Sequence, residues 1–477
     1  MKQALENLDY SLPSISRILS CYSIKNIENK SLINNIIDLF NHLKKYGFKE
    51  EDIKVITTLN PNILSFKENK LNERFADLEN LGYAKDRIIK MIYKSPSLLG
   101  YTKEYNERRI KFLKSLNYSL EEVLDMTYKF PALFDYTEEN IRIKLKDLKK
   151  LNISEDKIKR IIRKYPSICG LSINYILKKE EDLKDLGYSK KTIKNIFLKA
   201  PAIIGYDIKT IENKLNDFST IGFKKDEVIK LTSLNPTLLY YTKEVIENKI
   251  TVFISFGLTK EEVINMIKLS PEIISLSEEY IKDKYYYLKS LKYKEDEIPK
   301  ILKKAPSLFE HTNKNLDKKI KGYTLLGHKK NEVLAMILYC PNLFTYDIES
   351  IKDKHNVIIN CNYTEEEALQ IEKNYPNIYG FSKDSIKEKL NFYNNFGLHI
   401  VPLKNGKDLM QSIELSYARY NFFIDNNIEI NEQNYRNLLF INNNKFQKRY
   451  GISKEKLFVM YNYNEYKNGN SRSNSHR

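Results

Sequence analysis

Apolar residues recur along the chain in a helical pattern that repeats every 35 residues. In each stretch a proline is followed by two or three apolar residues, and others stand 10, 14 and 17 positions after it, as in Ile141, Leu145 and Leu148. That spacing places them on one face of a helix. The prolines are Pro61, Pro96, Pro131, Pro166, Pro201, Pro236, Pro271, Pro306, Pro341 and Pro376. A fixed period of this length predicts stacked repeats, each burying its apolar face against the next.

Polar residues mark where the helices of each repeat begin. With the proline as position 0, position +6 is a serine, threonine or aspartate in nine of the ten repeats. Such side chains accept hydrogen bonds from the free N–H groups at a helix start. The nine residues are Thr102, Thr137, Ser172, Asp207, Thr242, Ser277, Thr312, Asp347 and Ser382. Similar residues recur at +23, as in Ser119, Ser154 and Thr259, so each repeat is predicted to hold two helices.

Other residues mark where these helices end. Position +21 is glycine or asparagine in every repeat except one, where it is Lys292. Glycine and asparagine tolerate the left-handed backbone that closes a helix. The proline cannot continue the second helix, and it pushes the residue before it out of helical geometry. We therefore expect each proline to open a short turn of 3-10 helix that returns apolar residues to the core.

The predicted fold is all-α: an α-solenoid of 35-residue helix-turn-helix repeats, each closed by a proline turn. We expect an N-terminal cap over 1–25, the repeat array over 26–400, a C-terminal helical cap over 401–461 and a disordered tail over 462–477. The array begins with a unit that lacks the proline but keeps Gly47 at the turn position. The C-terminal cap is expected because the last repeat would otherwise expose its apolar face.

The composition favours a binding protein over an enzyme. A formal net charge of +17, from 79 basic and 62 acidic residues, favours nucleic acid or another anionic partner. No nucleophile, phosphate-loop, dinucleotide-binding or zinc-protease motif is found, so we expect no catalysis and no cofactor. No metal site is suggested either, because the cysteines have neither metal-ligand nor disulfide-framework spacing. They are Cys21, Cys169, Cys340 and Cys361.

The repeat resembles that of the mitochondrial transcription termination factor (mTERF) family. The resemblance rests on P-x-[IL]-[IL]-x-[YF]-[ST], then I-x-x-K-[LI]-x-x-L, then L-G-[YF]-[ST], as in residues 201–206, in Ile211 with Lys214 and Leu215, and in residues 186–189. It covers roughly residues 26–400. It implies a left-handed superhelix with a basic concave path that binds double-stranded DNA, or structured RNA in some members.

One polar position recurs without exception, because position +13 is lysine or arginine in all ten repeats. These residues are Arg74, Arg109, Lys144, Lys179, Lys214, Lys249, Lys284, Lys319, Lys354 and Lys389. They stand at the edge of the buried helix face. One interpretation is a boundary residue that covers the core with its alkyl stem while its charge reaches water. The interpretation we favour is a line of cations that contacts phosphates.

Arginine is confined to the two ends of the chain, with none between residues 163 and 419. Since bidentate reading of guanine depends on arginine, any base selectivity should come from the N-terminal set. That set is Arg74, Arg87, Arg108, Arg109, Arg142, Arg160 and Arg163. Lysines just before the proline turns are weaker candidates for phosphate contact, namely Lys94, Lys129, Lys164, Lys199 and Lys304.

The sequence therefore predicts a non-catalytic solenoid that binds duplex DNA and regulates transcription, as a termination factor does. The alternatives are a protein that binds RNA, such as ribosomal RNA, and a scaffold that binds proteins. No run of 18 or more apolar residues occurs, so we expect no membrane partner. We expect a monomer in the cytoplasm rather than in a mitochondrion, because the first residues, with Glu6 and Asp9, do not resemble a targeting leader.

Overall fold

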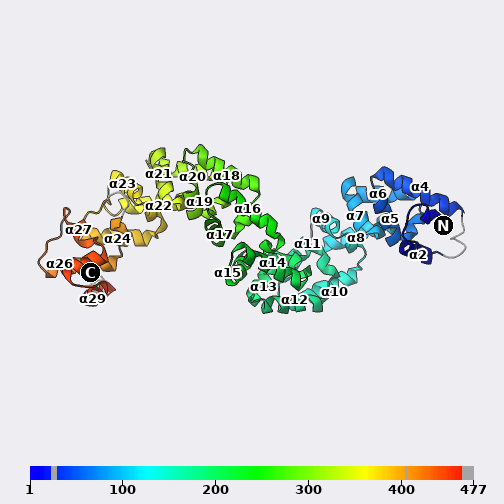
Figure 1. The fold of residues 1–477 in the computed structure, drawn as a ribbon, viewed down its shortest axis with the longest axis horizontal. Coiled ribbons are helices and arrows are strands. Elements are labelled where there is room, and N and C mark those ends of the chain that lie inside the picture. Colours follow the sequence, from blue (N-terminus) through cyan, green and yellow to red (C-terminus); the bar gives the residue numbers. More distant parts are fainter. Residues whose placement is uncertain (23–29, 403–406, 465–477) are drawn as a thin grey trace. The chain divides into compact units, whose positions relative to one another are not determined.

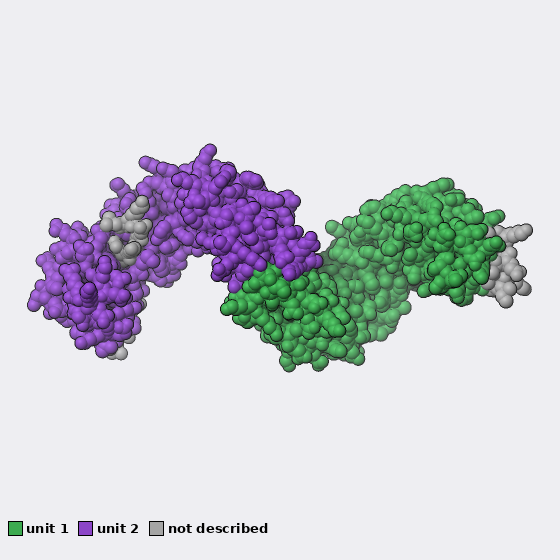
Figure 2. All heavy atoms as spheres, in the orientation of Figure 1, with its two compact units in different colours: residues 1–241 green, residues 242–477 purple. Residues whose placement is uncertain are grey.

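The computed structural model describes residues 1–22, 30–402 and 407–464. Within these ranges all regular structure is helical, which confirms the all-α prediction. The chain divides into two compact units, residues 1–241 and 242–477, which Figure 2 shows in different colours. Both units are built from the same repeat, and each is described by itself.

Unit 1 opens with two short helices, α1 (Lys2–Glu6) and α2 (Leu12–Ser20). The first helices of its repeats are α4 (Lys30–Tyr46), α6 (Glu68–Asn80), α8 (Lys103–Ser115), α10 (Glu138–Leu148, extended by the 3-10 turn η4, Lys149–Leu151), α12 (Ile173–Asp185) and α14 (Ile208–Ile221). The second helices are α5 (Glu50–Leu59), α7 (Lys85–Lys94), α9 (Leu120–Lys129), α11 (Glu155–Lys164), α13 (Lys190–Lys199) and α15 (Lys225–Leu234). The proline turns are η1 (Pro61–Ser65), η2 (Pro96–Gly100), η3 (Pro131–Phe134), η5 (Pro166–Gly170), η6 (Pro201–Gly205) and η7 (Pro236–Tyr240).

Unit 2 continues the repeat and ends in shorter helices. Its first helices are α16 (Lys243–Ser255), α18 (Glu278–Ser290), α20 (Asn313–Leu325), α22 (Ile348–Ile359) and α24 (Lys383–Asn395). The second helices are α17 (Lys260–Leu269), α19 (Ile298–Lys304), α21 (Lys330–Tyr339) and α23 (Glu365–Asn374), and the proline turns are η8 (Pro271–Ser275), η9 (Pro306–Glu310), η10 (Pro341–Phe344) and η11 (Pro376–Gly380). The last elements are α25 (Lys407–Met410), α26 (Ile413–Asp425), α27 (Tyr435–Leu439), α28 (Asn443–Tyr450) and α29 (Lys454–Met460).

Within each unit the repeats stack in register (Figure 1). First helices pack on first helices, as α6 does on α8, and second helices pack on second helices, as α7 does on α9. Proline turns also contact the second helix of the repeat before them, as η3 contacts α7 and η9 contacts α17. The buried residues between these layers are mostly isoleucine, leucine and phenylalanine, such as Ile211 and Phe218. The apolar spacing in the sequence therefore predicted the core correctly.

The predicted helix ends are confirmed with one exception. All nine residues at +6 accept a hydrogen bond from a backbone N–H two or three residues further on. Ser119 and Thr259 cap second helices and form capping boxes with Glu122 and Glu262. Ser154 stands at the start of α11, but its side chain caps nothing, so this predicted cap is wrong. The residue three positions on is Lys157, which has no carboxylate to complete a capping box.

The backbone at +21 is left-handed even where the sequence breaks the rule. Gly187 has φ +103°, and Lys292 has φ 71° in the same turn of its own repeat. A residue with a Cβ costs roughly 1–2 kcal/mol in this conformation. The repeat geometry therefore imposes the left-handed turn on Lys292, against the preference of the residue.

Two reciprocal substitutions test this constraint. Lys292→Gly is expected to raise the free energy of unfolding by about 0.5 kcal/mol, because relief of strain exceeds the extra entropy of the unfolded chain. Gly187→Lys is expected to lower it by about 1 kcal/mol, since no atom lies within 4 Å of the added Cβ and only the backbone opposes it. Urea unfolding followed by circular dichroism measures both. Equal effects of the same sign would contradict the assignment.

Candidate nucleic-acid interface

The cations at +13 lie inside the repeat stack rather than on its surface. None of the ten is more than partly exposed, and Lys284 is 0% exposed. Arg74, Arg109 and Lys179 are between 3% and 8% exposed. The side chains leave the first helix at the edge of its apolar face, as the sequence indicated, and then extend toward the next proline turn.

Six of the eight lysines at +13 donate a hydrogen bond to a backbone carbonyl that lies later in the chain. In four repeats the acceptor belongs to the residue directly before the next N-cap. These pairs are Lys144 with Leu171, Lys214 with Tyr241, Lys249 with Leu276, and Lys284 with His311. This carbonyl lies between the proline turn and the following helix, outside the hydrogen-bond ladder of both, so a side chain or water must satisfy it. The lysine is therefore the partner of a backbone group in the neighbouring repeat.

The remaining +13 residues find other partners. Lys354 Nζ donates to the carbonyl of Tyr379 at 2.6 Å, inside turn η11. Arg74 binds the carboxylate of Asp77 at 3.1 Å, and Arg109 donates to the hydroxyl of Tyr105 at 3.0 Å. Lys179 Nζ lies 3.7 Å from Oδ2 of Asp182 on its own helix. Lys319 is only 9% exposed.

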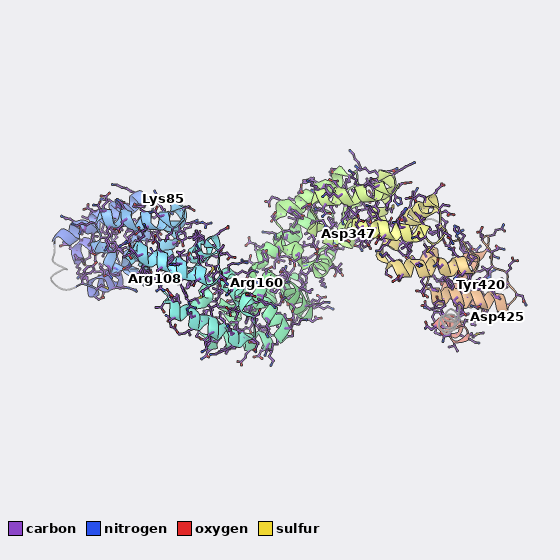
Figure 3. All side chains as sticks on the ribbon, turned by 180° about the vertical axis from the view of Figure 1, so that it is seen from behind. Lys85, Arg108, Arg160, Asp347, Tyr420 and Asp425 are labelled. Atoms are coloured by element: carbon purple, nitrogen blue, oxygen red, sulfur yellow. The ribbon has the colours of Figure 1, made fainter. Side chains whose placement is uncertain are left out.

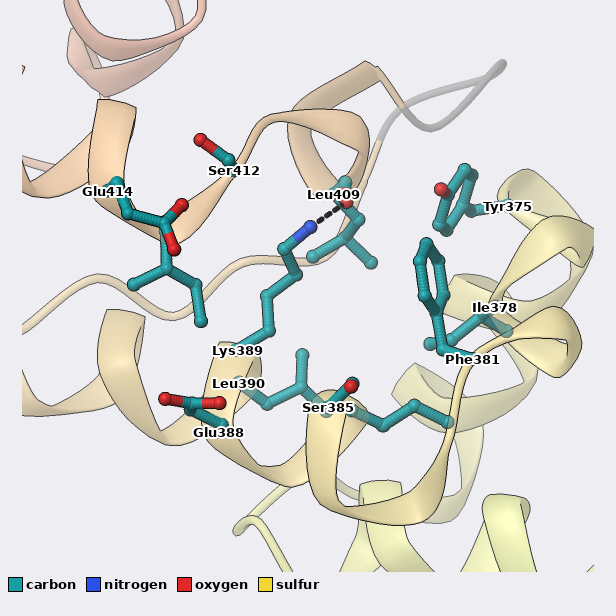
Figure 4. A pocket seen from close by; sticks show the side chains of 12 residues that line it. Tyr375, Ile378, Phe381, Ser385, Glu388, Lys389, Leu390, Leu409, Ser412 and Glu414 are labelled. Atoms are coloured by element: carbon teal, nitrogen blue, oxygen red, sulfur yellow. Dashed lines mark hydrogen bonds between the residues drawn. The ribbon is translucent and has the colours of Figure 1, made fainter.

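Burial makes several of these cations weaker bases. Burial lowers the pKa of Lys249 and Lys354, and it lowers the pKa of Lys284 and Lys389 to about 8. Figure 4 shows Lys389 bonded to the carbonyl of Leu409, beside a cavity of about 190 Å³ lined by Phe381 and other residues. Nucleic acid could reach such an ammonium group only in competition with the carbonyl that already holds it. The phosphate-contacting role of the +13 residues stays a prediction.

A different row of cations is exposed in unit 1. Each of four consecutive second helices, α7, α9, α11 and α13, ends in a lysine at +33, two residues before the next proline. These residues are Lys94, Lys129, Lys164 and Lys199, and all four are exposed. The helices pack successively on one another, so the lysines occupy one register along an edge of the stack. Lys129 Nζ lies 2.6 Å from Asp125, and Lys164 and Lys199 approach backbone carbonyls at 3.4 and 3.5 Å.

The sequence comparison agrees with this architecture. The mTERF family model matches residues 3–146, 137–293 and 286–399, which together span most of the chain. The chain belongs to the mTERF family. Membership implies a non-catalytic helical-repeat protein that binds nucleic acid. A search of curated proteins returned no match.

The mTERF repeat geometry also recurs beyond residue 400, where the sequence pattern fails. Ser412 caps α26, and Arg419 follows seven residues later, as a +13 cation follows its own N-cap. Arg419 is 1% exposed and donates to the carbonyl of Ile441 at 2.7 Å, directly before the N-cap Asn442. Sequence reasoning missed Arg419, because no proline marks the turn and the spacing to the preceding repeat is altered. Its distance from the serine cap was the available signal.

The arginines predicted to select bases differ in accessibility. Arg108, Arg142 and Arg160 are exposed, and Figure 3 labels Arg108 on α8 and Arg160 on α11. Arg163 forms an ion pair with Glu122 of the preceding repeat, and Arg87 lies 4.8 Å from the ring of Tyr128. Arg74 and Arg109 are buried, as described above. The set is therefore not gathered into one surface site.

The rest of the described chain offers little other chemistry. No group of three or more histidine, cysteine or acidic side chains there is arranged to hold a metal ion. Across the described ranges, no helix combines the length and apolar character needed to cross a membrane.

The packing role of the +13 cation predicts a contrast between two lysines of α18. Lys284 donates to the carbonyl of His311 at 2.6 Å and to Oδ1 of Asn313 at 2.7 Å, whereas Lys282 is exposed on the same helix. Lys284→Met keeps most of the stem but removes both hydrogen bonds of the ammonium group, and leaves the carbonyl of His311 with only the hydroxyl of Tyr280 at 3.0 Å. The free energy of unfolding should therefore fall by about 1–2 kcal/mol. Lys282→Met should change it by less than about 0.5 kcal/mol. Urea unfolding at pH 7 measures both, and equal losses would refute the packing role.

Proposed function

We propose that this mTERF protein binds duplex DNA along the exposed lysine row of unit 1, and that it acts on transcription by obstructing passage along the DNA. The observation that carries the proposal is the accessible cation at the same register of four consecutive second helices. Family membership supports nucleic acid as the partner. The net charge of +17 is consistent with a polyanionic ligand.

The length of the row suits a duplex. Packed helices lie about 8–10 Å apart, so four of them place their terminal lysines along roughly 25–30 Å. Duplex DNA offers one negative charge per about 1.7 Å of its axis, so phosphates are available at every step of the row. The ammonium groups of these lysines stand on flexible stems and can contact phosphates without reading bases. This would make the contact one of charge rather than of sequence.

The +13 residues and the arginines take different parts in this proposal. Six of the +13 lysines bind a backbone carbonyl of the following repeat, and so help to keep the second helices in register. Base selectivity is assigned to the exposed arginines Arg108, Arg142 and Arg160, since arginine is the residue best suited to reading guanine.

The proposal is tested by reversing charge on the row. A variant with glutamate at Lys94, Lys129, Lys164 and Lys199 is compared with the natural chain by fluorescence anisotropy on a labelled DNA duplex at several salt concentrations. Loss of four phosphate contacts should reduce the slope of log affinity against log salt by about 3–4. Single-stranded DNA and duplex RNA of the same sequence are measured in parallel.

A matched control carries the same charge change on another surface. Lys114, Lys146, Lys149 and Lys184 are also exposed, but lie on the last turns of first helices or directly after them. Their replacement by glutamate should leave most of the salt slope in place. An equal loss in both variants would show that net charge, not the row, drives binding. Tighter binding to RNA than to DNA would show that RNA is the partner. If the protein binds no nucleic acid, a protein-binding scaffold is favoured.

A further inference from the structure

A buried cluster of ionisable side chains replaces a neutral pair in unit 2. In unit 1 the hydroxyl of Tyr83 meets that of Thr127 at 2.5 Å, and Tyr188 meets Thr232 at 2.7 Å, in each case 44 residues apart. The same two repeat positions in unit 2 are His328 and Glu372. His328 Nε2 lies 2.8 Å from Oε2 of Glu372, which is 0% exposed.

A second histidine completes the cluster. His355 of α22 is 3% exposed and occupies position +14, where other repeats carry an apolar residue such as Leu145. Its Nδ1 lies 2.9 Å from Oε1 of Glu372, and its Nε2 lies 3.0 Å from Oε1 of Glu365. Both ring nitrogens of His355 therefore face carboxylate oxygens at hydrogen-bond distance.

This geometry fixes the protonation state of His355. A neutral imidazole has one N–H donor and one lone pair, so one nitrogen would direct its lone pair at a carboxylate. Only the imidazolium form can donate to Glu372 and Glu365 together. Burial acts to lower the pKa of His355, but the two glutamates outweigh it and raise the pKa. Burial likewise acts to raise the pKa of Glu372, and the hydrogen bonds from both histidines outweigh it and lower that pKa.

We infer that His355, Glu372 and Glu365 form a proton-dependent lock that fastens α22 to α23 while His355 is charged and loosens these helices when it loses its proton. A group whose pKa is raised in the folded state contributes stability that is fully present below its unfolded value and is lost as pH rises through its folded value. For His355 that loss begins above about pH 6.5. The inference does not depend on nucleic acid binding.

The tyrosine, cysteine and other glutamate side chains near the cluster do not supply this dependence. Tyr323 of α20 and Tyr379 of η11 are buried, and burial holds the pKa of both well above 10. Glu332 of α21 pairs with Lys373 of α23 at 2.6 Å, and that contact keeps the pKa of Glu332 low. His399, which follows α24, pairs with another carboxylate of α23, Glu367, at 2.9 Å. Variants at His355 and its partners therefore separate the effect of the lock from that of His399. The buried thiol of Cys340 has a pKa that burial raises.

The test is hydrogen–deuterium exchange of the full chain between pH 6 and 9, with rates corrected for intrinsic exchange. Protection of α22 and α23 should fall by up to about tenfold per pH unit once His355 begins to titrate. Helices α7 and α9 serve as the internal control and should keep their protection, because the neutral pair of Tyr83, just before α7, and Thr127, on α9, takes the place of the cluster there. A flat profile in α22 and α23 would refute the lock.

Two variants separate the lock from a general effect of pH. The triple variant H328Y/H355L/E372T restores residues that the chain itself uses at these repeat positions and should remove the pH dependence. If this variant does not fold, Glu365→Gln is the second test. It removes only the exposed carboxylate and should move the loss of protection to lower pH. An unchanged profile in either folded variant would overturn the inference.

Discussion

The stack depends on one contact, in which a cation of one repeat satisfies a backbone carbonyl of the next. In the four repeats where a +13 lysine binds it, the carbonyl before the N-cap lies outside both neighbouring helices, so loss of the lysine would cost about 0.5–1.5 kcal/mol. Lysine and arginine are long donors without an acceptor, whereas glutamate has no proton to give. This explains the basic residue at +13 in the six repeats where the lysine donates to a backbone carbonyl. Since the donor and acceptor belong to successive repeats, the contact sets the register of the stack.

This packing role changes how charge can serve function. A cation that holds the backbone is buried and becomes a weaker base, as the pKa of about 8 for Lys284 shows. Phosphate contact requires cations that reach solvent, and these occur at the ends of the second helices in unit 1. In the proposed mode of binding the two rows have different roles, because the inner row helps to keep the helices in register and the outer row presents charge to the nucleic acid. A basic repeat protein need not place its most regular cations on its binding surface.

The repeat also tolerates a change of chemistry at fixed geometry. Tyr188 with Thr232 and His328 with Glu372 occupy equivalent positions and make equivalent contacts, but only the second pair can be charged. Burying Glu372 would be costly without donors, and the two histidines supply them. One repeat frame can therefore hold a neutral joint in one unit and a proton-sensitive joint in another.

The sequence by itself determined the local structure. The caps at +6, the left-handed turns at +21 and the proline turns depend on residues within a few positions of each other, so spacing was enough to predict them. The hydrogen-bond acceptor of the +13 side chain could not be predicted in this way, because it is distant in sequence. In the pair Lys144 and Leu171 the two residues are 27 positions apart. The two histidine partners of Glu372 lie 44 and 17 residues away, so only the stacked structure shows them. The same holds for the contact of Arg419, which no proline marks in the sequence. Only the tertiary structure decides which cations reach water, because burial depends on how neighbouring repeats pack rather than on the residues of one helix.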